Sequence, residues 1–247
     1  EPEANVAAAA RYMAELQGHF SDVGDPLWAY YGYVCDGIFQ NEEEIKNHPT
    51  QSMGTPVPGD LKYRDLNGDK VVDSKDRQVL GSYFPKINFG LNLSVQYKDF
   101  DLSALLQGAA DVKSAPVAEI RYAFYNGGKV TEQHLDRWTP ENPNASVPRL
   151  TWNDTNRNAR SESDRFLEDG SYFRMRSLQI GYTFPKKWFK GFVEKARVYV
   201  SGDNLFTITS YTGYSPDVNS TNMYSRGFDE FIYPNSRTFM MGINVTF

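Results

Sequence analysis

The stretch Thr238–Phe247 limits most strongly how this chain can fold. Phe239, Met241, Ile243, Val245 and Phe247 alternate there with polar or small residues. Such period-two alternation puts the apolar side chains of a β-strand on one face and the remaining side chains on the other. About ten residues also suffice for one tilted strand to cross a lipid bilayer. The same stretch would equally suit the last core strand of a soluble β-sandwich, so the rest of the chain has to decide.

Four further segments show the same alternation, and the links between them differ in length in a regular way. The segments are Phe89–Tyr97, Phe100–Ala109, Arg174–Phe184 and Arg197–Phe206. In chain order, the links between these strands are very short (98–99), long (110–170), short (185–195) and long (207–237). Outer-membrane barrels have short turns on the periplasmic side and long loops outside, whereas a sandwich has no reason to separate links by length. The pattern therefore predicts an all-β fold that contributes antiparallel strands to a transmembrane β-barrel.

Composition supports a membrane barrel and argues against other classes. Aromatic residues make up 15% of the chain, yet its mean hydropathy is -0.57, as expected where loops and one strand face are polar. The net charge of -5, without a Lys/Arg cluster, argues against a nucleic-acid partner. Cys35 is the only cysteine, which excludes a disulfide framework and a CxxC metal or redox site, and it is expected to be a buried small apolar residue.

No catalytic motif is present, so the chain is not expected to be an enzyme. His19, His48 and His134 are scattered and fit loop or surface positions better than metal ligation. The acidic run Glu42–Glu44 fits a solvated surface. Aromatic residues in the long links could stack on sugar rings, but interfacial and loop packing are commoner roles; these residues are Tyr122, Tyr125, Trp138, Trp152, Tyr211, Tyr214 and Tyr224.

The sharpest local motif lies between residues 65 and 76 and is typical of a Ca²⁺-binding loop. Oxygen-bearing side chains occupy loop positions 1, 3, 5, 9 and 12, and position 7 would offer its backbone carbonyl. Position 6, usually glycine, is Lys70, and position 12 carries Asp where an EF-hand has Glu. The alternative is a turn whose side chains bond their own backbone. The predicted ligands are Asp65, Asn67, Asp69, Val71, Asp73 and Asp76.

Ordered sequence blocks across about residues 30–247 resemble one family, the C-terminal part of TonB-dependent outer-membrane transporters of the SusC/RagA type. The blocks are Gly32–Gln40, Pro58–Asp69, Tyr97–Leu102, Asp169–Leu178, Gly181–Pro185, Asn204–Phe206, Tyr233–Pro234 and Gly242–Phe247. Residues 1–25 lie outside this resemblance and are left unassigned, with helix-compatible spacing over Glu1–Phe20. Residues 26–247 are expected to form the barrel part, with long external loops at about 40–84, 110–170 and 207–237.

The resemblance implies a 22-stranded barrel in the intact family, with an N-terminal plug and a TonB box that this chain would lack. It further implies a SusD-like surface lipoprotein as a lid, glycans or oligopeptides as cargo, and the TonB complex as the energy source. The chain would supply the last strands, pair with the remainder of the barrel and leave its C-terminus in the periplasm. Gly242, Val245 and Phe247 would then form the assembly signal.

Two other functions fit part of the sequence. A secreted, calcium-dependent glycan-binding β domain would explain the aromatic residues and the loop of residues 65–76, which we call the acidic loop. It would not explain the alternation of link lengths. A porin-like barrel without energised transport would explain the strands alone.

Overall fold

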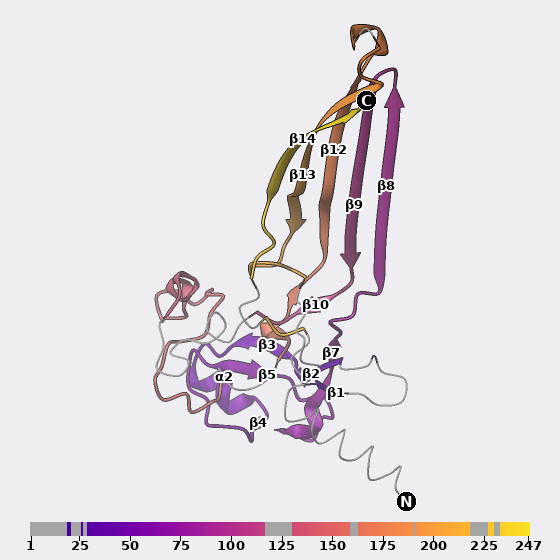
Figure 1. Cartoon of the computed structure of the whole chain (residues 1–247). Coiled ribbons are helices and arrows are strands. Elements are labelled where there is room, and N and C mark those ends of the chain that lie inside the picture. The colour runs from indigo at the N-terminus through magenta and orange to yellow at the C-terminus, as the bar shows by residue number, and fades with distance from the viewer. Residues whose placement is uncertain are drawn as a thin grey trace, which may run out of the picture. The chain divides into compact units, whose positions relative to one another are not determined.

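The computed structural model describes residues 19–20, 26, 29–116, 130–158, 163–189, 191–217, 227–229 and 233–247 (Figure 1). The chain divides into two compact units. The sheet unit comprises Pro85–Val112, Asp169–Asp217 and Ile232–Phe247, and the loop unit comprises Glu1–Phe84, Lys113–Glu168 and Val218–Phe231. Within the described residues, no helix is long and apolar enough to cross a membrane.

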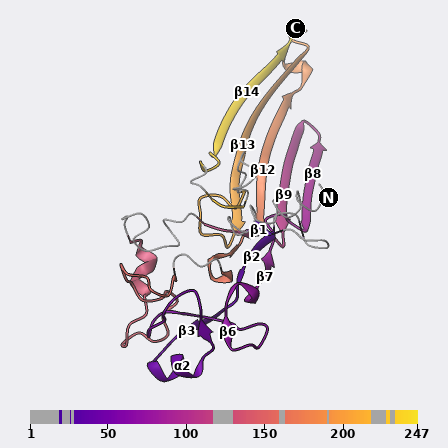
Figure 2. The same ribbon diagram turned by 90° about the horizontal axis from the view of Figure 1, so that it is seen from below.

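Five long strands make up the sheet unit (Figures 1 and 2). They lie side by side in the order β14-β13-β12-β9-β8, and each neighbouring pair is antiparallel. The predicted all-β, antiparallel fold is thus confirmed, with small differences at the strand ends. The bounds are β8 Ile87–Tyr97, β9 Phe100–Ala110, β12 Tyr172–Phe184, β13 Lys195–Thr209 and β14 Thr238–Thr246, and the 3-10 helix η5 (Lys186–Phe189) follows β12.

The register gathers the predicted apolar positions of all five strands on one face of the sheet. Val95 pairs with Leu102, Leu102 with Ile180, and Ile180 with Val200, which in turn pairs with Met241. Paired residues share a face, so the alternation in each strand adds up to one apolar surface. Its side chains on β8 and β14 are exposed, as Leu93 (43%) and Met241 (83%) illustrate. Large apolar side chains so arranged need a covering phase, because water is a poor solvent for a patch of this extent.

Two irregularities keep the apolar face continuous. The register of β12 shifts between Met175 and Ser177 against both of its neighbours. On β13, Asn204 lies between Asp203 and Phe206, the pairing positions on either side of this shift; it has a φ of 52° and donates its Nδ2–H to the Ser236 carbonyl at 3.0 Å. Asn tolerates this left-handed conformation better than most residues. The extra residues at these bulges restore the in-and-out alternation on each strand.

The loop unit carries short elements around a small core. Tyr33, Leu61, Tyr63, Val72 and Phe166 form this core. Within its described residues the unit contains the short sheets β1-β2-β7, β3-β5 and β4-β6, and β10 pairs with β11. The elements are β1 His19–Phe20, β2 Ala29–Tyr33, β3 Cys35–Ile38, α2 Glu42–Asn47, β4 Thr50–Gln51, β5 Leu61–Tyr63, β6 Val71–Val72, η1 Ser74–Asp76, β7 Arg77–Gly81, β10 Lys113–Ser114, η3 Glu132–Asp136, η4 Asp164–Phe166 and β11 Glu168–Asp169.

Several sequence expectations fall in this unit. The segments expected as external loops at about 40–84 and 110–170 contain short strands and helices, and their external location stays a prediction. The acidic run is the first turn of α2, where the Asn41 side chain accepts from the Glu44 N–H as an N-cap. Most of the helix expected over Glu1–Phe20 lies outside the described residues, but its last two residues form β1.

Cys35 is only partly buried, packed against the core of the loop unit, and burial is the main cause that raises its thiol pKa. A raised pKa keeps the thiol protonated at neutral pH, which makes it a poor nucleophile.

Candidate functional site

The acidic loop folds around its own backbone N–H groups. Asp65 accepts from Gly68 (2.7 Å) and Lys70 (2.8 Å). Asn67 accepts from the N–H of Asp69, and Asp69 from that of Val71 (2.8 and 2.9 Å). These are the local side-chain turns that the sequence left open as the alternative reading.

The two ends of the acidic loop are joined by Asp76. One carboxylate oxygen of Asp76 accepts from the Leu66 and Asn67 N–H groups, and the other accepts from the Asp73 N–H at 2.8 Å. Burial raises the pKa of Asp76, but these backbone donors outweigh it and leave the pKa below its ordinary value. Asp73 completes the turn as the cap of η1, accepting from Lys75 at 2.8 Å.

The calcium assignment stays a prediction. Lys70 has a φ of 68°, so it adopts the left-handed conformation that glycine usually supplies at position 6. The departure from glycine therefore does not prevent the tight turn. However, within the described part of the chain, no three or more His, Cys, Asp or Glu side chains are grouped so that they could hold a metal ion. The donor set is suited to a hard cation, but its carboxylates already serve the loop's own backbone.

The proposed assembly-signal residues lie on β14 and just after it. Val245 and Phe247 are exposed, at 44% and 79%. A Cβ on Gly242 would overlap the ring of Tyr199, so Gly242 is required for that ring to lie across the strand. The role of these residues in assembly stays a prediction.

The polar face of the sheet carries a charged cluster that sequence reasoning missed. Arg197 on β13 donates from Nε to Oδ1 of Asp101 on β9 at 2.9 Å, across the intervening strand β12. A Cβ on Gly181 of β12 would overlap both side chains. The Arg197 guanidinium also lies 5.1 Å from the Tyr199 ring centroid. Each partner looked unremarkable in the sequence, because the pair is set by cross-strand register.

The rest of the polar face is rich in hydrogen-bonding groups. The amide and hydroxyl side chains that the register places there can form hydrogen bonds with hydroxyl or peptide groups of a solute. They include Asn88, Asn92, Ser94, Gln96, Ser103, Gln107, Ser177, Gln179, Thr183, Ser201, Thr207, Thr238, Asn244 and Thr246.

Arg174 binds residues of the long link after β13 on the polar face of the sheet. Its side chain is 2% exposed and bonds Thr207 Oγ1 (3.0 Å), Asp217 Oδ2 (3.2 Å) and Ser215 Oγ (3.5 Å). It also lies 5.0 Å from the Tyr172 ring centroid. Because a buried guanidinium without a partner is costly, these contacts hold residues 215–217 in place.

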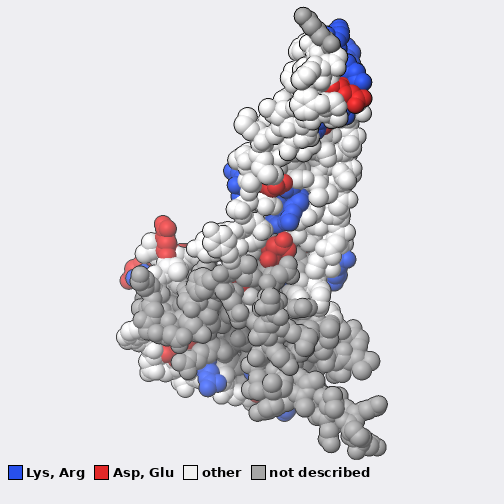
Figure 3. All heavy atoms as spheres, viewed as in Figure 1, with Lys and Arg blue, Asp and Glu red and all other residues white. Residues whose placement is uncertain are grey.

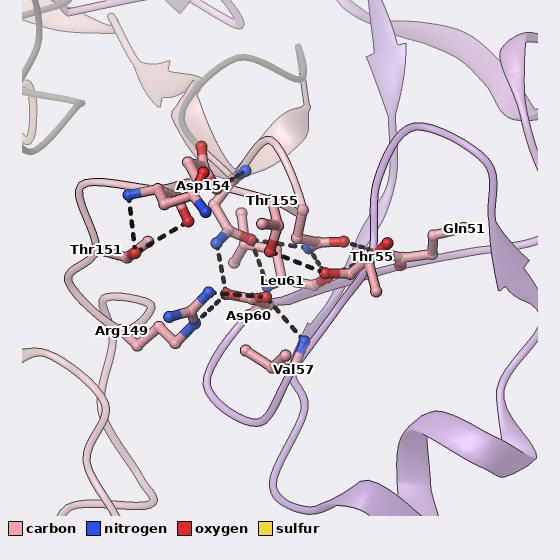
Figure 4. A network of polar contacts seen from close by, with 12 residues as sticks. Gln51, Thr55, Val57, Asp60, Leu61, Arg149, Thr151, Asp154 and Thr155 are labelled. Atoms are coloured by element: carbon pink, nitrogen blue, oxygen red, sulfur yellow. Dashed lines mark hydrogen bonds and ion pairs between the residues drawn. The ribbon is translucent and has the colours of Figure 1, made fainter.

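A buried polar network holds the loop unit together (Figure 4). Asp60, 0% exposed, accepts from the Val57 N–H (2.9 Å), Arg149 Nε (2.6 Å) and Asn158 Nδ2 (2.8 Å). Asn156 accepts from Gln51 at 2.7 Å and donates to Asn158 at 2.9 Å. The segments 51–63 and 149–158 are distant in sequence, and this network joins them.

Packing beside this network explains why a glycine is needed in the sequence block Pro58–Asp69. Gly59, next to Asp60, has a φ of 94°, and a Cβ there would overlap Trp138 and Arg149.

The loop aromatics divide by exposure. Trp152 (73%) and Tyr214 (70%) are exposed, whereas Tyr211 is 6% exposed. Trp138 donates its indole N–H to the side-chain oxygen of Gln40 at 2.9 Å, so it takes part in contacts within the loop unit. Tyr122, Tyr125 and Tyr224 lie outside the described residues.

Two of the three histidines, His48 and His134, have side chains that the structure describes. His134, expected in a loop or at the surface, is buried (4%) in η3; burial is the main cause that lowers its pKa, and its ring bonds Thr131 at 2.9 Å. A ring nitrogen of His48 lies 2.8 Å from the Pro49 carbonyl oxygen. The side chain of His19 is not among those that the structure describes.

Comparison with known proteins agrees with the resemblance read from the sequence. No protein-family model matches the chain. The chain is 31% identical to TonB-dependent receptor P3 of Formosa agariphila over 98% of its own length and 24% of the relative's. It is 26% identical to TonB-dependent receptor SusC of Bacteroides thetaiotaomicron, over 87% of this chain and 20% of SusC. The 98% coverage means that the match includes most of residues 1–25, which the sequence reading had left outside.

Solved structures share the fold. The RagAB peptide transporter matches with a TM-score of 0.72 at 22% identity, over 94% of this chain and 24% of that chain. The RagAB peptide importer in its open-open state matches with a TM-score of 0.70 at 23% identity, over 93% of this chain and 23% of that chain. Since the relatives are receptors, the expectation that this chain is not an enzyme is confirmed. The chain is homologous to TonB-dependent receptors of the SusC/RagA type, and it spans about a quarter of the length of the curated relatives it matches.

Proposed function

We propose that this chain forms the last strands of the β-barrel of an outer-membrane TonB-dependent transporter. The observation that carries the proposal is the five-stranded sheet with one exposed apolar face and one polar face. Receptors of this class are outer-membrane β-barrels, and their strands alternate in this way. The apolar face would contact lipid, and the polar face would line the lumen.

The open edges of the sheet support the barrel assignment. Among the described residues, β8 pairs only with β9 and β14 only with β13. Unpaired strand edges are not tolerated in hydrocarbon, where water cannot satisfy the backbone groups. The remainder of the barrel would pair with both edges, leaving the short turns and the C-terminus on the periplasmic side.

Transport in this scheme needs no bond chemistry from the chain. Its polar face would offer amide and hydroxyl groups to a passing glycan or oligopeptide. Asp101 and Arg197 neutralise each other, so the wall would not trap a charged cargo there. A SusD-like lipoprotein would cover the external opening, and the TonB complex would supply energy through the plug.

The secreted, calcium-dependent glycan-binding domain has less support. It leaves the apolar face of the sheet without a covering phase, and receptor relatives match nearly the whole chain. The porin-like alternative shares the sheet and is separated from the proposal by a requirement for TonB energy.

The proposal is tested by fractionating cells that express the full-length gene. We expect a product that is heat-modifiable, extracted only by detergent and co-purified with a surface lipoprotein. Uptake of that lipoprotein's ligand should stop when TonB is removed. A freely soluble monomer would refute the barrel assignment, and uptake that persists without TonB would favour the porin-like alternative.

A further inference from the structure

One end of the sheet unit combines lysines with exposed aromatic rings. We call it the turn end and define it as residues 98–99, 185–189, 191–195 and 246–247. Backbone contacts bring these segments together: the Thr183 N–H donates to the Asp99 carbonyl (2.8 Å), and the Glu194 N–H to that of Thr246 (2.7 Å). The turns after β8 and β12 therefore lie at the same end of the sheet.

The described residues of the turn end carry excess positive charge. The lysines are Lys98, Lys186, Lys187 and Lys195, against the carboxylates of Asp99 and Glu194. Figure 3 shows blue side chains grouped at this end of the sheet, with a smaller red group beside them.

Among the described residues of the turn end, weak pairing offsets part of this charge. Lys186 lies 3.4 Å from Glu194, but both side chains are largely exposed (72% and 62%), so water screens the pair. At the opposite end of the sheet, Lys86 is paired with Asp111 at 2.7 Å, also between exposed side chains.

Exposed aromatic side chains stand next to these lysines. Trp188 is 61% exposed and its ring centroid lies 5.7 Å from that of Phe184. Phe192 (80%) and Phe247 (79%) contact each other edge-on at 5.9 Å. Rings of this kind, with ammonium groups beside them, suit the boundary between acyl chains and headgroups.

Lys98 lies 5.3 Å from the ring centroid of Tyr97, which the register places on the apolar face. We propose that the turn end binds anionic phospholipid, with Lys98 and Lys187 facing the headgroup phosphate and Trp188 and Phe192 entering the upper acyl region. This inference rests on the proposed function, because it needs the apolar face to lie in a bilayer. Charge selects the headgroup: an anionic lipid gains from each lysine, whereas a zwitterionic one gains little. The exposed rings select a lipid over free phosphate, since phosphate alone would leave them in water.

The test uses the full-length receptor, purified in neutral detergent and exchanged into micelles containing phosphatidylglycerol or phosphatidylcholine. Native mass spectrometry reports the lipid retained. We expect the receptor to retain phosphatidylglycerol in preference, and Lys98→Gln/Lys187→Gln to lower that preference about tenfold. The control Lys46→Gln/Lys86→Gln removes equal charge elsewhere and should leave it unchanged. Trp188→Ala should weaken retention of both lipids to a similar extent.

Equal retention of both lipids by the unaltered receptor, or an unchanged preference in Lys98→Gln/Lys187→Gln, would overturn the inference. Displacement of the lipid by millimolar inorganic phosphate would identify a phosphate site and would also overturn it. A receptor that still folds as a heat-modifiable, detergent-dependent protein yet shows no lipid preference would contradict this inference alone and leave the proposed function intact.

Discussion

Replacing Asp60 by alanine should open the loop unit locally. The change deletes a fully buried carboxylate that accepts from the Val57 N–H, Arg149 Nε and Asn158 Nδ2. All three donors would lose their acceptor, and Asn158 is itself 4% exposed, so water reaches it poorly. An unsatisfied buried donor costs about 1–3 kcal/mol.

The magnitude depends on how far water can replace the carboxylate. Removing one partner of a buried ion pair costs about 3–5 kcal/mol. The Arg149 side chain is 24% exposed and can recover part of its hydration, which favours the lower half of that range. We therefore expect the free energy of local opening to fall by about 3–4 kcal/mol, which speeds amide exchange by about two to three orders of magnitude.

The assay is hydrogen exchange at the amides of Val57, Leu61 and Tyr63 in the full-length receptor. Asp36→Ala is the matched control, because it removes a carboxylate from an ion pair with Arg64 that is exposed to solvent. Fast exchange in Asp60→Ala but not in Asp36→Ala is expected. Equal protection in Asp60→Ala and the unaltered receptor would refute the argument that this network joins the two segments.

Four further predictions concern other sites. Gly181→Val should displace Arg197 from its ion pair and lower the temperature of heat modification; an unchanged temperature would contradict the required close approach. Phe247→Ala should reduce outer-membrane yield, measured by immunoblot of membrane fractions, whereas full yield would count against its role in assembly. We propose that the acidic loop binds Ca²⁺, so the cation should protect this loop from proteolysis and Asp69→Ala should abolish the protection. Protection that persists in Asp69→Ala would refute the calcium assignment. Because the pKa of Asp76 is depressed, its contribution to stability is present at neutral pH and is lost as the pH falls below about 4; Asp76→Asn should remove this pH dependence of loop proteolysis.

The sheet could be predicted from the sequence because its signal is local. Each strand repeats a two-residue pattern, so Phe89–Tyr97 or Thr238–Phe247 can be interpreted without knowing its neighbours. Antiparallel neighbours joined by a two-residue turn also follow from the sequence alone. The bulges near Met175 and Asn204 could not be predicted, because they interrupt the alternation that serves as the signal.

The polar network of the loop unit and the ion pair on the polar face could not be predicted, for a different reason. Asp60 and Arg149 are separated by 89 residues, and Asp101 and Arg197 by 96, so each pair exists only once the fold brings them together. Polar segments such as 149–158 lack the periodicity that marks a strand or helix, although their side chains build a buried network. The acidic loop was recognisable because its spacing is local, yet that spacing is shared by metal-binding loops and by turns that bond their own backbone.

The central claim is that one face of the sheet contacts lipid while the other faces a water-filled lumen. It is tested most directly by single cysteine substitutions along β14 of the full-length receptor in intact outer membranes, at positions 239, 241 and 243 and at positions 238, 240 and 244. We expect a water-soluble maleimide to label Thr238→Cys, Met240→Cys and Asn244→Cys, and a lipid-soluble reagent to label Phe239→Cys, Met241→Cys and Ile243→Cys. Labelling of all six positions by the water-soluble reagent at similar rates would contradict the membrane-embedded sheet.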